Sequence, residues 1–80
     1  MSPITDDPKE LLQASLSMVV HAGFAPTGEI VLETAARKIY GFGDVTIAAA
    51  RRIAEQAKAE LMAAGKLHAP VRGNWRLIRE

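Results

Sequence analysis

The sequence has no cysteine, which excludes a disulfide framework and any metal site built on thiolate ligands. No stretch approaches the roughly 18 apolar residues that a transmembrane helix needs. Asp6 and Asp7 stand where a signal peptide would carry positive charge. Aromatic side chains are scarce, at 5% of the chain, so the core must be largely aliphatic. These absences predict a cytoplasmic protein that does not enter a membrane.

The residues that are present suit one small globular domain. Apolar residues make up 49% of the 80 positions and charged residues 24%, a balance typical of folded proteins rather than disordered ones. A chain of this length is one domain at most. We expect a flexible lead over residues 1–7 and a single domain over residues 8–80.

Charge is distributed unevenly along the chain, although the formal net charge is only +1. Residues 1–36 carry one base and five acids, whereas residues 37–80 carry nine bases and four acids. A basic second half indicates a polyanionic partner on that side of the molecule. Small helical domains also divide their charge in this way by chance.

Two amphipathic helices are expected in the first half of the chain. Asp7, followed by a proline, is a good N-cap for a helix over residues 8–22, and Gly23 can end it. The linker over residues 24–28 contains proline and glycine and leaves room only for a short extended segment. The next apolar spacing predicts a second helix over residues 29–40.

The longest predicted helix covers residues 44–64, with Asp44 as its N-cap and Thr46 as the alternative. One face of this helix is a continuous apolar stripe. The stripe consists of Ile47, Ala50, Ile53, Ala54, Ala57, Leu61 and Ala64. The opposite face carries Ala48, Arg52, Glu55 and Ala59, with Ala49 and Gln56 beside them.

The spacing of apolar residues changes from helical to alternating after Gly65. Apolar residues alternate from Leu67 onward, the segment Arg72-Gly73-Asn74 is typical of a turn, and alternation resumes at Trp75. This pattern predicts a β-hairpin over residues 66–79 that packs on the helices, with Trp75 as its anchor. The expected core comprises Leu12, Leu16, Val19, Leu32, Ile39, Ile53, Leu61, Leu67, Trp75 and Leu77.

The order of these elements defines the expected fold class. A tight glycine-bounded turn joins the second and third predicted helices, which matches a helix-turn-helix. The hairpin after the third helix adds a wing. We therefore expect a mainly α, α+β domain: a winged helix-turn-helix with three helices and a C-terminal β-hairpin.

Several short segments resemble a known family. They are Val19-Val20, Glu33-x-Ala35-Ala36-Arg37, Gly41-Phe42, Gly65-Lys66-Leu67 and Gly73-Asn74-Trp75-Arg76-Leu77. Over roughly residues 10–78 the chain resembles the winged-helix superfamily and, more narrowly, a small C-terminal domain of unknown function in large bacterial helicase- and restriction-type proteins. The resemblance rests on core and turn positions, so it implies a fold and a bacterial origin more than a function. The chain departs from strong DNA readers at Ala48 and Ala49, where such proteins carry polar groups.

No catalytic or cofactor site is expected. His21 and His68 are isolated, and no His pair or carboxylate cluster has the spacing of metal ligands. The segment Gly41-Phe42-Gly43 is too short for a phosphate-binding loop. The sequence therefore predicts a non-enzymatic protein without metal or small-molecule cofactor.

Double-stranded DNA is the leading predicted partner, on the resemblance and the charge distribution together. The third helix would enter the major groove. Residues expected near the bases are Thr46, Ala48, Ala49, Arg52 and Gln56. Residues expected on phosphates are Arg51, Lys58, Arg72 and Arg76. The alternative for the helix is an ordinary solvated face on which Arg51 pairs with Glu55.

A protein-interaction module is the second interpretation. Winged helices also bind proteins, and the partner would be another protein or a larger protein of which this domain is part. An exposed apolar patch would carry that contact. It comprises Ala48, Ala49, Ala59, Met62 and Ala63.

Overall fold

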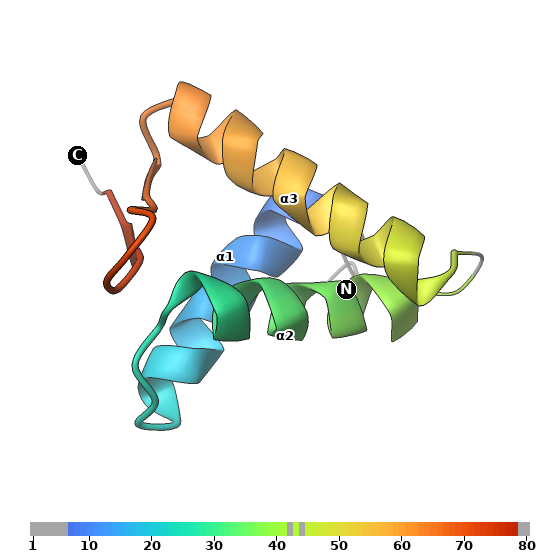
Figure 1. Ribbon diagram of the computed structural model, residues 1–80, viewed down its shortest axis with the longest axis horizontal. Helices are drawn as coiled ribbons and strands as arrows, with labels where there is room; N and C mark the ends of the chain where they lie inside the picture. Colours follow the sequence, from blue (N-terminus) through green and yellow to red (C-terminus); the bar gives the residue numbers. More distant parts are fainter. Residues whose placement is uncertain (1–6, 42, 44, 79–80) are drawn as a thin grey trace, which may run out of the picture.

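Three helices cross one another and a short antiparallel hairpin follows them (Figure 1). In this computed structural model the described residues are 7–41, 43 and 45–78. The elements are α1 (Pro8–His21), α2 (Gly28–Gly41), α3 (Ile47–Ala63), β1 (Leu67–His68) and β2 (Arg76–Leu77). This is the winged-helix-like α+β layout that the sequence predicts.

Helix α1 begins and ends where the sequence predicts, within one residue. The Asp7 carboxylate accepts a hydrogen bond from the Lys9 backbone N–H at 3.0 Å, which satisfies one free amide of the first turn. At the other end Gly23 takes a φ of 91°, a left-handed conformation that glycine adopts at little cost.

Helix α3 begins at Ile47, two residues later than an N-cap at Asp44 would require. The Thr46 hydroxyl accepts from the Ala49 backbone N–H at 3.1 Å, and Thr46 itself is extended, as an N-cap residue must be. Thr46 is thus the N-cap, and Asp44 lies outside the described residues. The preference for Asp44 is wrong. Asp44 and Thr46 are both good capping residues and lie two positions apart, so only the backbone geometry shows which of them is the N-cap.

The core lies where the three helices meet, and alanine makes α2 and α3 fit closely. Five alanines of these helices are 3% exposed or less, so the two backbones approach each other without intervening bulk. They are Ala35, Ala36, Ala50, Ala54 and Ala57. Most of the expected core is buried, but Ile53 and Leu77 are only half-buried.

The apolar stripe of α3 is shorter than the sequence predicts. Ile47 is 55% exposed and Ala64 is also exposed, so the stripe is buried only between these ends. Helical periodicity predicts which side of α3 faces the core. How much of that side is buried depends also on how far α1 and α2 extend beside it.

The hairpin is joined by a third extended segment. Leu67 pairs with Leu77, and His68 with Arg76. Just before β2, the backbone N–H of Trp75 donates to the Pro26 carbonyl at 2.8 Å, and Thr27 forms a β-bridge with Asn74. The linker between α1 and α2 therefore lies beside the residues that lead into β2.

Trp75 fixes the hairpin to the helices, as expected. Its side chain is 4% exposed and belongs to the main core cluster. A Cβ at Gly28 would stand only 2.8 Å from Cζ2 of the indole, so the first residue of α2 must be small. The Lys58 Nζ lies 5.6 Å from the ring centroid, within cation–π range.

Candidate nucleic-acid interface

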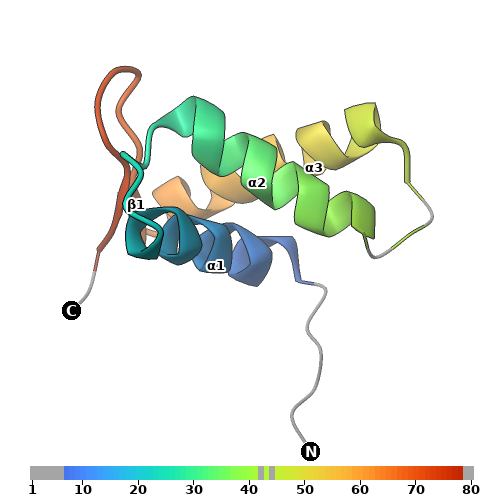
Figure 2. The same cartoon turned by 90° about the horizontal axis from the view of Figure 1, so that it is seen from below.

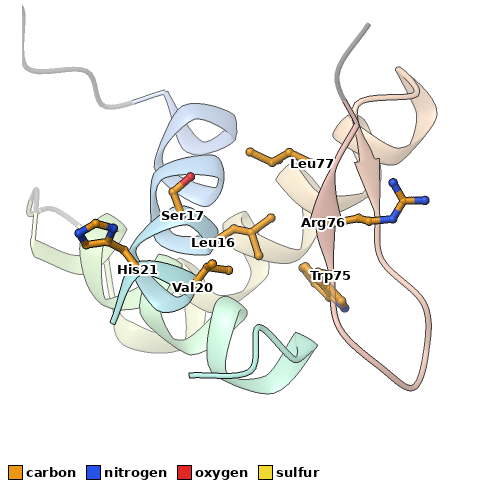
Figure 3. A pocket seen from close by; sticks show the side chains of 7 residues that line it. All are labelled: Leu16, Ser17, Val20, His21, Trp75, Arg76 and Leu77. Carbon is orange, nitrogen blue, oxygen red and sulfur yellow. The ribbon is translucent and has the colours of Figure 1, made fainter. Parts of the chain in front are cut away.

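The hairpin turns one face toward the helices and the other toward solvent. Residues directly opposite each other on paired strands project from the same face of a sheet. The pair Leu67–Leu77 lies on the inner face, and the pair His68–Arg76 on the outer one. Figure 3 shows Arg76 pointing away from α1 while Leu77 points toward it. Alternation also places Lys66 and Ile78 on the outer side, where the Ile78 N–H donates to the Lys66 carbonyl.

We call these four exposed residues, Lys66, His68, Arg76 and Ile78, the hairpin outer face. The turn that follows β1 adds Arg72, which is also exposed. No acidic residue occurs from position 61 to position 78. Within the described part of the chain, Lys66, Arg72 and Arg76 form no ion pair with a carboxylate. This end of the molecule therefore presents unpaired positive charge.

One arginine on α3 and one on α2 have acidic partners, by contrast. Arg51 pairs with Glu55 at 3.6 Å, as the alternative interpretation of this helix predicted. Arg37 on α2 pairs with Glu33 at 3.0 Å. Arg51 also lines a hollow of about 420 Å³, to which Glu29, Glu33 and Arg37 of α2 contribute.

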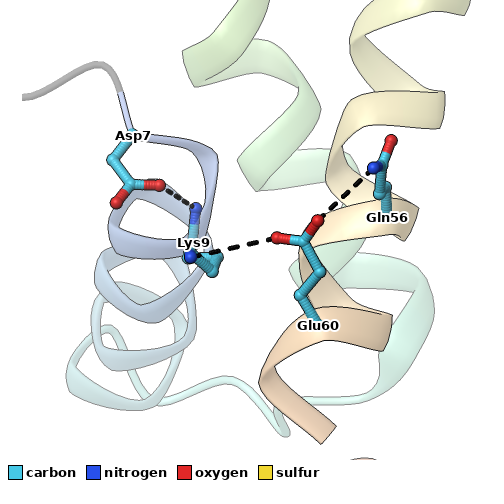
Figure 4. Close-up of polar contacts among 4 residues, drawn as sticks. All are labelled: Asp7, Lys9, Gln56 and Glu60. Carbon is cyan, nitrogen blue, oxygen red and sulfur yellow. Dashed lines mark hydrogen bonds and ion pairs between the residues drawn. The ribbon is translucent and has the colours of Figure 1, made fainter. Parts of the chain in front are cut away.

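Gln56 is held in a network between α3 and α1. Its side-chain amide donates to Glu60 at 3.3 Å, and Glu60 is 4.0 Å from the Lys9 ammonium (Figure 4). Two positions along a helix correspond to a rotation of about 200°. Lys58, which lies over Trp75, therefore projects from nearly the opposite side of α3 to Gln56.

Three of the expected base-contacting residues, Ala48, Arg52 and Gln56, follow one another at four-residue spacing and are exposed on one side of α3. The Thr46 hydroxyl serves as the N-cap acceptor, and Ala49 is half-buried. Arg51 and Lys58 project from other sides of the helix, and Arg72 and Arg76 lie at the hairpin end, so the nine expected DNA-contacting residues do not form one face.

The first turns of α3 and the hairpin lie at opposite ends of the molecule (Figures 1 and 2). Seventeen residues separate them along α3, a helix about 25 Å long. A duplex can meet Arg52 and Arg72 together only if it runs along the length of α3.

Two basic residues of the hairpin outer face, Lys66 and His68, were not among the expected site residues. The signal that could have identified them is strand alternation: both have the parity that puts them on the same face as Arg76 once the hairpin register is known. The turn length that determines this register was not visible in the sequence.

A shallow apolar hollow lies between α1 and β2 (Figure 3). Its volume is about 310 Å³, and Leu16, Val20, Trp75 and Leu77 supply its apolar surface. Val20 is 53% exposed at its margin. The predicted alanine patch on α3 is elsewhere: Ala48, Ala59, Met62 and Ala63 are exposed, whereas Ala49 is half-buried.

Other kinds of site were sought over the same described residues. There, no three His, Asp or Glu side chains come together in a way that could hold a metal ion. None of the three helices is long and apolar enough to cross a membrane.

Comparisons with known proteins add no relative. No protein-family model matches the chain, and no curated protein or solved structure is significantly similar to it.

Proposed function

We propose that this chain is a non-catalytic DNA-binding domain, in which α3 faces the major groove and the hairpin contacts the sugar–phosphate backbone. The observation that carries the proposal is the unpaired positive charge at the hairpin end. Arg72 and Arg76 are exposed, no described carboxylate pairs with them, and the sequence from 61 to 78 contains no acid. Cations in this state can release counterions from a duplex, which provides most of non-specific affinity.

Weak sequence selectivity is part of the proposal. Arg52 is exposed on α3 and pairs with no carboxylate of the described residues, and an arginine of this kind can contact guanine. Its neighbours on the outward side are Ala48 and Ala59, which can contact a thymine methyl but donate no hydrogen bond. Arg51 and Gln56 already have partners within the domain. Backbone contacts therefore outnumber base contacts.

The test is a titration of a fluorescently labelled random duplex, read by anisotropy at about 50 mM and about 200 mM salt. We expect a dissociation constant of about 10⁻⁴–10⁻⁶ M, the usual non-specific range, and a steep loss of affinity with salt. The double variant Arg52→Ala/Arg72→Ala should weaken binding to every duplex by a similar factor and flatten the salt dependence. The folded core should survive, since both side chains are exposed.

Arg37→Ala is the matched control, because it also removes one arginine charge but from an ion pair on α2. It should change affinity less than Arg72→Ala does alone. If the unaltered domain shows no binding to excess duplex at low salt, the proposal is wrong.

A protein-interaction module is the second candidate, and the apolar hollow between α1 and β2 favours it. Val20 and Ile78 are partly exposed near the two elements that form this hollow. A domain that fails to bind DNA and whose Val20→Asp variant loses a protein partner would support this function instead.

A further inference from the structure

The cross-strand pair His68–Arg76 is the most closely defined group of cations in the molecule. These two residues are register partners, so their Cβ atoms are about 4.5–5.5 Å apart. Both are exposed on the hairpin outer face, and Lys66 shares that face two residues before His68. Two groups at this spacing can both contact the non-bridging oxygens of one phosphate.

The charged groups nearest His68 on the hairpin are basic. β1 packs against β2 and α3. From β2 the facing group is Arg76, and Lys66 directly precedes β1. On α3, Lys58 lies on the inner side over Trp75. The acids closest to this end, Glu60 of α3 with Asp7 and Glu10 at the start of α1, line a hollow with Lys66. In the described part of the chain no carboxylate pairs with the imidazole.

We propose that His68 and Arg76, with Lys66 beside them, form a phosphate site for the nucleic-acid backbone, and that binding there takes up a proton on His68. This inference rests on the proposed DNA-binding function. A phosphodiester bound across the pair favours the imidazolium form, because its negative charge lies beside the ring. The proton comes from solvent and is held on the ring while the phosphate is bound.

The direction of the pH dependence follows from this uptake. If the complex binds more protons than the free domain, affinity must rise as pH falls. Histidine is the side chain that changes charge between about pH 5 and about pH 8. Ordinary carboxylate and lysine side chains, by contrast, keep their charge over most of this interval. Duplex binding should therefore tighten toward the acidic end.

The experiment measures duplex affinity by anisotropy at about pH 5 and about pH 8, at constant ionic strength. We expect binding about two- to fivefold tighter at the lower pH, the range of one exposed ion pair. His68→Gln should remove most of this difference. His21→Gln is the matched control, because His21 is exposed on the last turn of α1, outside the hairpin outer face, and this variant should keep the full difference.

A second readout follows the two imidazoles separately. NMR titration of their ring protons should show the midpoint for His68 moving to higher pH when duplex is added, while that for His21 stays in place. If the domain binds duplex equally well at both pH values, or His68→Gln keeps the pH difference, the phosphate site is wrong although DNA binding stands. If no duplex binds at either pH, both proposals fail together.

Discussion

The helical part of the molecule and its hairpin end use charge differently. On the helices, Lys9, Arg37 and Arg51 each lie close to a glutamate, so their positive charge is compensated locally. At the hairpin end, Lys66, Arg72 and Arg76 have no such partner among the described residues. Exposed ion pairs contribute little to folding stability. The contrast therefore bears on what each region can bind more than on how well it folds.

The two regions also differ in how they are held. The helices share an extended aliphatic core, whereas each hairpin strand has only two residues. A hairpin of this size is not stable by itself in water. Trp75 supplies the tertiary contact that the two short strands lack, because its side chain packs against α2 and α3.

The sharpest way to break this arrangement is Trp75→Ala. We expect a loss of about 3–5 kcal/mol in the free energy of unfolding, because the ring is enclosed and its removal leaves a cavity. In a domain of this size each kcal/mol lowers the melting temperature by roughly 4–8 °C. Thermal denaturation followed by circular dichroism measures the change. Val71→Ala on the same hairpin is the control and should have almost no effect, since Val71 is fully exposed. If both variants melt together, Trp75 is not the anchor.

Gly28→Ala tests the same contact from the helical side. The added Cβ would stand 2.8 Å from the indole, so the ring or the helix must shift, at a cost of about 1–3 kcal/mol. Gly41→Ala makes the same change at the other end of α2, where no described atom beyond the neighbouring residues and the helix backbone lies within 4 Å of the added Cβ, and it should leave stability unchanged or slightly raised. Urea denaturation of the two variants gives the comparison. Equal stabilities would show that the close contact between Trp75 and α2 does not affect the free energy of unfolding.

Thr46→Ala asks whether α3 begins where the structure places it. Loss of the hydroxyl leaves the Ala49 N–H without its capping partner, which should cost about 0.5–2 kcal/mol. Asp44→Ala is the comparison, because Asp44 was the N-cap expected from sequence. A larger cost for Asp44→Ala than for Thr46→Ala, in chemical denaturation, would contradict the observed start of the helix.

The smallest effect, a change in duplex affinity, is expected from Glu55→Gln. This variant removes the ion-pair partner of Arg51 and leaves the arginine unpaired, like the cations at the hairpin end. If duplex lies along α3, its affinity should rise, by less than about fivefold. Glu33→Gln frees Arg37 on α2 in the same way and should raise affinity less. Anisotropy at low salt distinguishes them. No change for either variant would remove α3 from the proposed interface while leaving the hairpin in it.

Local patterns in the sequence predicted the fold well, because each depends on neighbouring residues. Apolar spacing located the helices within a few residues, Gly23 ended α1, and alternation identified the hairpin. Features that depend on remote segments were not predictable in this way. The bridge from Thr27 to Asn74 is one, and the exposed end of the α3 stripe at Ile47 is another.

The candidate site shows the same limit. Four-residue spacing suggested the pair Arg51–Glu55 within one helix, but a pair between two helices, such as Lys9–Glu60, was not visible in the sequence. The expected site residues also omitted His68, because the face on which a strand residue lies depends on a register that only the folded hairpin reveals. DNA binding itself stays a prediction.

The hydrogen bond from Trp75 to Pro26 has a consequence for how the domain folds. It joins positions almost 50 residues apart, on either side of both α2 and α3. Closing so long a loop costs entropy that only a preformed helical framework can offset. The sheet should thus be the last part to form and the first to open, so amide hydrogens of the hairpin should exchange with solvent faster than those of the helices. A surface assembled late and opened easily can adjust its shape to a partner without unfolding the core.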